Sequence, residues 1–157
     1  YWLARQLASM DLSENDVVVL DTPPGRTAYL TQALTVADQV LVVVTADAAC
    51  FVTLDQMEHL LAERAALGHA PLCNYVINQF DGSRLFCSDM HEVLKRRLGS
   101  RLLGVVTLDH AIGEALAYGQ NPLLTAESSQ ACHDMLMLSD RLKAQLKSME
   151  AAESYAS

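Results

Sequence analysis

Short apolar runs and helix-like apolar stripes alternate along this chain. The runs are rich in β-branched residues, as in Val40-Leu41-Val42-Val43-Val44, and such runs predict strands. Between them, apolar side chains recur every three or four residues, as at Leu54, Met57 and Leu61, which predicts helices. Strands are expected at residues 17–20, 39–45, 71–78 and 102–107. Helices are expected at residues 1–10, 27–37, 51–67, from the turn at 81–83 to 98, 111–118 and 128–149.

The order of these elements predicts the fold class. Strands without polar alternation are buried on both faces, which is typical of a parallel sheet covered by helices. Parallel strands joined by helices cross over right-handed, and the result is a three-layer architecture. We therefore expect an α/β protein with a mostly parallel sheet flanked by helices, as a single domain over residues 1–157.

Composition narrows the range of functions. The chain is 51% hydrophobic and 19% charged, which is typical of a globular protein. Its 11 Lys and Arg against 19 Asp and Glu give a formal charge of −8, which disfavours a surface that coats nucleic acid. The basic cluster at residues 95–101 is therefore interpreted as solvated surface. No apolar run reaches the roughly 18 residues of a membrane-spanning helix. The four cysteines lack metal-ligand spacing and are interpreted as buried small hydrophobes.

One acid stands out because of its position after a predicted strand. Asp21 follows Val17-Val18-Val19-Leu20 and precedes Thr22-Pro23-Pro24-Gly25. The prolines end the strand, and Gly25 allows a sharp turn close to a ligand. Ligands of open α/β sheets bind beyond the carboxyl ends of the strands, where a carboxylate can hold Mg²⁺ beside a nucleotide phosphate. The alternative is that Asp21 caps the next helix and that Pro-Pro-Gly is an ordinary rigid turn.

Four stretches in register resemble the deviant-Walker ParA/MinD ATPases. The segment 16–25 is similar to their Walker B strand and switch II, and 37–44 is similar to the strand that follows. The segment 76–80 resembles the strand that ends in Asn, and 103–122 resembles the last strand, nucleotide loop and helix. The resemblance runs from about residue 16 to residue 146. Within the family, segments 45–50, 77–80 and 101–110 are most similar to the cellulose-biosynthesis (BcsQ-type) branch.

This resemblance implies site residues and ligands, namely ATP and Mg²⁺. Asp21 would hold Mg²⁺ through water as the catalytic acid, and the switch would consist of Thr22, Pro23, Pro24 and Gly25. The nucleotide base would lie against Asn78, Thr107, Leu108 and Asp109. Asp47 would reach across a homodimer to the partner's nucleotide. Three alternatives stay open: Asp47 and Asp109 can each cap a helix, and Asp81 can either read guanine or serve the Asp81-Gly82 turn.

The chain also departs from the family pattern. It contains neither G-x-x-x-x-G-K-[ST] nor K-G-G-x-x-x-x-[ST], so the phosphate loop is missing from this sequence. Val106-Thr107 stands where the family usually has Ile-Pro. We therefore expect the C-terminal part of a longer protein, and we expect this part alone not to hydrolyse ATP.

The expected function is an ATP-controlled homodimer, with ATP at the interface, that assists or localises bacterial cellulose synthesis and secretion. Its partners would be cellulose-secretion proteins at the inner membrane. The protein would be cytoplasmic, or peripheral at that membrane through its partners, with neither nucleic-acid binding nor direct membrane insertion. The alternatives are a ParA/MinD-type partition or positioning ATPase, and a non-hydrolysing scaffold that depends on nucleotide.

Overall fold

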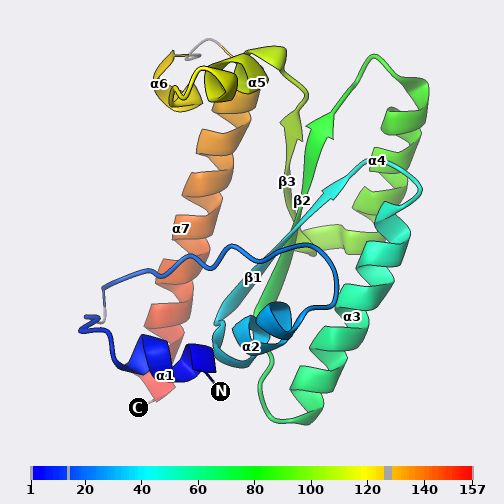
Figure 1. Cartoon of the computed structure of the whole chain (residues 1–157). Helices are drawn as coiled ribbons and strands as arrows, with labels where there is room; N and C mark the ends of the chain where they lie inside the picture. Colours follow the sequence, from blue (N-terminus) through cyan, green and yellow to red (C-terminus); the bar gives the residue numbers. More distant parts are fainter. Residues whose placement is uncertain (1, 14, 126–128, 157) are drawn as a thin grey trace. The chain divides into compact units, whose positions relative to one another are not determined.

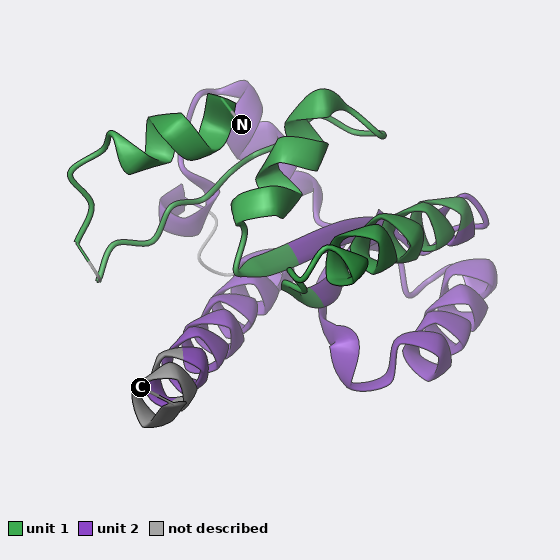
Figure 2. Cartoon of the chain, turned by 90° about the horizontal axis from the view of Figure 1, so that it is seen from below, with its two compact units in different colours: residues 1–40, 52–73 green, residues 41–51, 74–157 purple. Residues whose placement is uncertain are grey.

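A computed structural model describes residues 2–13, 15–125 and 129–156. Tyr1 and Ser128, at which two of the predicted helices begin, lie outside the described residues. The chain divides into two compact units, residues 1–40 with 52–73 and residues 41–51 with 74–157 (Figure 2). We describe each unit by itself and call them unit 1 and unit 2.

Unit 1 is helical. It holds α1 (Trp2–Ala8), α2 (Ala28–Val36) and all but the first two residues of α3 (Cys50–Ala66) (Figure 1). The Thr27 side chain caps α2 by accepting a hydrogen bond from the Leu30 N–H at 3.1 Å. The Leu3 N–H donates to the Gln32 side chain at 3.0 Å, which ties α1 to α2.

Unit 2 contains most of the sheet, whose strand order is β1-β2-β3. Strands β2 and β3 are parallel, and α7 lies along β3 (Figure 1). The apolar runs formed the strands that their composition predicted in this unit, with buried Val side chains in all three. The elements are β1 (Gln39–Thr45), β2 (Leu72–Phe80), α4 (Leu85–Leu98), η1 (Gly99–Arg101), β3 (Leu102–Thr107), α5 (His110–Ala117), α6 (Pro122–Thr125) and α7 (Gln130–Ala156).

The core of unit 2 lies where α7 packs against the sheet. Its buried members are Val76, Leu103, Val106, Ala131 and Leu138. The close approach depends on Gly104 in β3, because a Cβ atom at that position would lie only 2.6 Å from the Leu138 side chain. Arg141 of α7 donates a hydrogen bond to the carbonyl oxygen of Leu103 beside it. The helix is therefore fixed to β3 by both apolar packing and a polar contact.

The predicted strand at residues 17–20 is wrong. The segment is irregular, and the side chains of Val17 and Val19 are 67% and 87% exposed. A strand exists only when its N–H and C=O groups pair with a neighbouring strand, and the described residues form no such ladder here. Composition predicted an intrinsic preference for strand, but a partner is needed to form one.

Two further expectations need correction. In β1 the burial alternates, with Val42 and Val44 buried and Val43 57% exposed, so this edge strand is not covered on both faces. The last helix does not end near residue 149 but continues to residue 156, since no Gly or Pro stops it. The short α6, which the pattern of apolar residues did not predict, begins at Pro122, a residue that favours the first helical turn.

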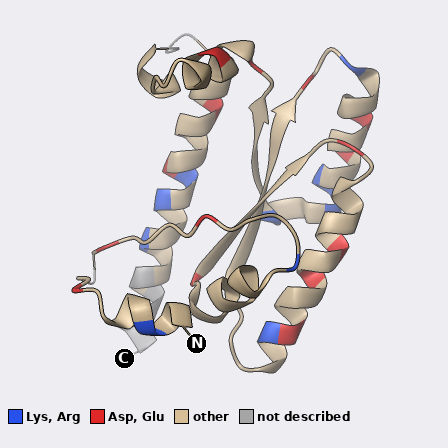
Figure 3. Ribbon diagram, viewed as in Figure 1, with Lys and Arg blue, Asp and Glu red and all other residues tan. Residues whose placement is uncertain are grey.

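The charged residues of α3 are acidic except for Arg64, whereas α7 carries residues of both signs (Figure 3). Three basic residues gather in the last turn of α4. In the described part of the chain, no helix combines the length and the apolar composition that crossing a membrane requires.

Candidate functional site

A bulge shapes the carboxyl end of β2. Ile77 pairs with Val105 and Phe80 with Thr107, so two residues of β2, Asn78 and Gln79, stand opposite one residue of β3. Gln79 has a φ of 54°, which is uncommon for a residue other than glycine. Such strained positions occur often beside functional sites, because a bulge redirects the neighbouring side chain.

Asn78 is half-buried at this bulge. Its Oδ1 atom accepts a hydrogen bond from the Gln79 N–H at 3.0 Å, and this holds the amide in one orientation. The Nδ2 group is then the part of the side chain that can donate to a ligand. The Leu108 N–H donates to the Phe80 carbonyl oxygen at 2.8 Å, so the end of β2 is joined to the loop that follows β3. The structure therefore brings Asn78 close to the base loop, which we define as residues 107–109.

Two carboxylates hold the base loop to the N-terminal end of α7. Asp134 Oδ2 accepts from the Thr107 N–H at 2.9 Å, and Asp134 Oδ1 accepts from Gln130 Nε2 at 2.8 Å. In the opposite direction, Asp109 of the loop interacts electrostatically with Ser129 and with the Gln130 backbone at the start of α7. We call Asp109 and Asp134 the carboxylate pair. Each comes from one segment and interacts with the other, so the loop and the helix start form one polar connection.

Asp109 also caps α5, as one of the sequence alternatives proposed. Its Oδ1 atom accepts from the Ala111 N–H at 2.9 Å. The hydrogen bonds from Ser129 and Ala111 lower the pKa of Asp109 below its usual value, since they stabilise the charged form. For Asp134, partial burial raises the pKa, but the hydrogen bonds from Thr107 and Gln130 outweigh it and the pKa is also lowered. Both groups are therefore held as carboxylates at neutral pH.

Asp81 and Asp47 have local structural partners. Asp81 Oδ1 accepts from Ser83 N at 3.0 Å and from Ser83 Oγ at 2.6 Å, which confirms the turn alternative and lowers the pKa of Asp81. Asp47 Oδ1 accepts from the Cys50 N–H at 3.1 Å at the start of α3, which confirms the capping alternative. The cross-dimer contact of Asp47 stays a prediction.

Asp21 lies in unit 1 and has a different environment. It is exposed and forms no hydrogen bond or ion pair with the residues that the structure describes. It does not cap α2, because Thr27 does so. Gly25 has a φ of 90°, a conformation that favours glycine, and this confirms the sharp turn after the prolines.

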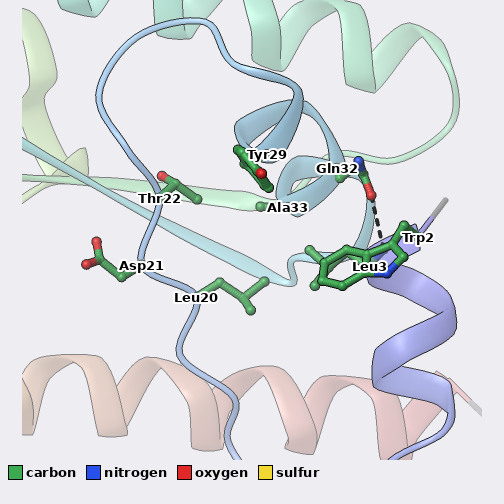
Figure 4. A pocket seen from close by; sticks show the side chains of 8 residues that line it. All are labelled: Trp2, Leu3, Leu20, Asp21, Thr22, Tyr29, Gln32 and Ala33. Atoms are coloured by element: carbon green, nitrogen blue, oxygen red, sulfur yellow. Dashed lines mark hydrogen bonds between the residues drawn. The ribbon is translucent and has the colours of Figure 1, made fainter.

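A small cavity of about 100 Å³ lies beside Asp21 and Thr22 (Figure 4). In Figure 4 the Leu20 side chain points toward Trp2 and Leu3, whereas the Asp21 carboxylate points away from them. The cavity is therefore mainly apolar, and the carboxylate is turned to solvent. Its lining residues are Trp2, Leu3, Leu20, Asp21, Thr22, Tyr29, Gln32 and Ala33.

The donor set at Asp21 fits Mg²⁺ only together with other ligands. Among the residues that the structure describes, no three His, Cys, Asp or Glu side chains gather as a metal site. Mg²⁺ in nucleotide sites is held by one or two carboxylates, with water and phosphate oxygens completing its shell. A single solvent-facing carboxylate such as Asp21 suits that arrangement.

Sequence reasoning missed three residues that build the base-loop region: Gln79, Ser129 and Asp134. Ser129 is 7% exposed, and its Oγ atom accepts from the Cys132 N–H at 3.3 Å as the cap of α7. Asp134 contacts Thr107 across 27 positions of sequence, so no local pattern indicates the contact. Only Ser129 could have been found from a local pattern, because a Ser directly before an amphipathic helix indicates a helix cap.

Taken with its helices, the sheet defines an α/β protein. The chain has the fold of the cell division ATPase MinD from Pyrococcus furiosus, with a TM-score of 0.54 and 17% sequence identity. The superposition covers 80% of this chain and 50% of the MinD chain, so this chain spans half the length of that relative. This confirms the predicted fold class.

Residues 2–142 match the family described as cellulose biosynthesis protein BcsQ. The chain therefore belongs to the BcsQ family. No curated protein matches it.

Proposed function

We propose that this chain is the C-terminal part of an ATP-dependent switch that acts in bacterial cellulose synthesis and secretion. The observation that carries the proposal is the grouping of Asn78 with the base loop at the carboxyl ends of adjacent parallel strands. This is where open α/β sheets bind nucleotides. Membership of the BcsQ family supports the link to cellulose.

The hydrogen-bonding groups at this position favour adenine over guanine. The Thr107 N–H is engaged by Asp134 and the Leu108 N–H by Phe80, so the base loop offers carbonyl oxygens, which have two lone pairs each. Adenine presents an amino group to such acceptors, and its ring nitrogens can accept from Asn78 Nδ2. Guanine would instead need a carboxylate such as Asp81, whose Oδ1 atom is held by Ser83 in a local turn.

In the proposed switch, Asp21 holds the water shell of Mg²⁺, and Thr22, Pro23, Pro24 and Gly25 respond to the γ-phosphate. Mg²⁺, when bound, neutralises negative charge that develops on the phosphate oxygens. The turn at Gly25 is suited to a segment with two arrangements, because glycine adopts either sign of φ at low cost. Asp47 contacts the partner's nucleotide in an ATP-bound homodimer, which associates with cellulose-secretion proteins at the inner membrane from the cytoplasmic side.

The test uses the natural full-length protein. Asp21→Ala should lower ATP turnover by about a hundredfold, the scale for loss of a group that stabilises developing charge. Asp11→Ala is the matched control, because Asp11 is also exposed in unit 1. Equal turnover in the two variants would refute the role of Asp21. In cells, Asp21→Ala should fail to restore cellulose to a strain that lacks the gene.

The same preparation separates the other functions. A nucleotide-dependent dimer without turnover in the wild type would indicate a non-hydrolysing scaffold. Binding to nonspecific DNA at physiological salt would indicate a partition ATPase. Competition between ATP and GTP tests the base assignment, and tighter binding of GTP would contradict it.

A further inference from the structure

The carboxylate pair joins the base loop to α7 in both directions, as described above. Asp134 accepts from the Thr107 backbone N–H at 2.9 Å. This bond fixes the end of β3. Gln130, one turn earlier in α7, holds the other oxygen of Asp134 at 2.8 Å. Asp134 therefore has a single orientation, supported by its own helix.

The opposite end of the connection is equally ordered. Ser129 is buried, its hydroxyl caps α7, and the residue lowers the pKa of Asp109. Asp109 in turn holds the start of α5 through Ala111. Buried polar groups that are fully hydrogen-bonded make a local structure rigid. The base loop is thus held by two helices, although it is itself irregular.

The position of the carboxylate pair beside the base loop suggests that it does more than stabilise the fold. Thr107 pairs with Phe80 and Leu108 is bonded to it, and the bulge with the strained Gln79 stands one position earlier, opposite the residue before Thr107. A loop that must meet a flat ligand edge needs its carbonyl groups fixed before binding, because ordering them on binding would reduce affinity. Asp134 lies behind the loop and orders it through Thr107.

We propose that Asp134 is a positioning residue for the nucleotide base, acting through Thr107 to hold the base loop in its binding conformation. This inference rests on the proposed function. It assigns to α7 a part in the site that the sequence did not indicate. Asp134 touches no ligand in this proposal, so its effect should concern the base and not the phosphates.

The test measures binding of ATP and of ribose 5-triphosphate, which lacks the base, to the full-length protein. Asp134→Ala should weaken ATP binding by about tenfold, the scale for loss of a hydrogen bond to a charged group. Binding of ribose 5-triphosphate should not change. Asp134→Asn keeps an acceptor for Thr107 and should bind ATP nearly as the wild type does. Asp140→Ala is the control, since Asp140 is an exposed acid of the same helix.

A second measurement does not depend on nucleotide. Amide hydrogen exchange at Thr107, followed by NMR, should be about tenfold faster in Asp134→Ala. Unchanged exchange, unchanged ATP binding, or equal losses for ATP and ribose 5-triphosphate would each overturn the inference. Failure of the wild type to bind ATP would overturn the proposed function and this inference with it. ATP binding that Asp134→Ala leaves intact would overturn the inference alone.

Discussion

Replacing Gly104 with Ala tests how closely α7 packs on β3. The added Cβ atom would lie 2.6 Å from Leu138 Cδ2 and 3.3 Å from Arg141 Nη1. Leu138 is buried in the core, and Arg141 is bound to the carbonyl of Leu103, so neither side chain can move aside without losing contacts. Overpacking of this kind costs about 1–3 kcal/mol.

A smaller effect has the opposite sign. Gly→Ala reduces the entropy of the unfolded chain and stabilises by roughly 0.4–1 kcal/mol where the native conformation suits alanine. The net expectation for Gly104→Ala is a loss of about 1–2 kcal/mol in the free energy of unfolding. With a slope of about 2 kcal/mol per molar urea, the urea midpoint should fall by roughly 0.5–1 M.

Urea unfolding of the full-length protein, followed by circular dichroism, is the measurement. Gly113→Ala is the control, because a Cβ atom there meets no atom within 4 Å and the residue lies in α5. That variant should gain roughly 0.5–1 kcal/mol. Gly104→Ala combined with Leu138→Ala should be less destabilised than the sum of the single changes, because the smaller side chain leaves room for the methyl group. Equal stability of Gly104→Ala and Gly113→Ala would contradict close packing of α7 on β3. Additive effects of Gly104→Ala and Leu138→Ala would contradict it as well.

Three other predictions concern caps and charges. Asp47→Ala should cost about 1 kcal/mol of stability through loss of the α3 cap, and Asp47→Asn much less, as measured by thermal unfolding. The folded-state pKa of Asp109 is lowered from its ordinary value of 3.8. The charged Asp109 therefore stabilises the folded state above pH 3.8, and this stabilisation is lost as the pH falls through the lower folded pKa. Asp109→Asn should remove this part of the acid sensitivity, as measured by unfolding at a series of pH values. Glu63→Gln breaks the exposed ion pair with Arg26, 3.0 Å long, and should change the unfolding free energy by less than about 1 kcal/mol in 0.15 M salt.

The pattern of apolar residues predicted the elements of unit 2 well because each strand there has a partner. Residues 102–107 form β3 with the bounds expected, and Gly99 ends α4 as a residue of positive φ. Residues 17–20 have an equally strong preference for strand, yet they are irregular. Pairing is a long-range property, so a sequence window that predicts β3 correctly also predicts a strand where no ladder exists.

In the candidate site, too, local features could be predicted from the sequence and long-range contacts could not. Capping follows local rules, so the roles of Asp47 and Asp109 at helix starts were available as alternatives from spacing alone. The bulge at Asn78 and Gln79 was not, because it arises from the register between two strands. The contact between Asp134 and Thr107 could not be predicted from the sequence either, because it depends on how α7 packs on β3.

The hydrogen bonds that shape the base loop also decide which bases it can select. With the N–H groups of Thr107 and Leu108 engaged, the loop presents acceptors, and a base with an amino donor is favoured over one with a carbonyl oxygen. Asp134→Ala releases the Thr107 N–H, which could then donate to the guanine carbonyl. The ratio of ATP to GTP affinity should therefore fall toward one in Asp134→Ala but stay at the wild-type value in Asp140→Ala, as measured by competition binding to the full-length protein. A lower ATP affinity with an unchanged ratio would mean that Asp134 orders the loop but does not set its selectivity.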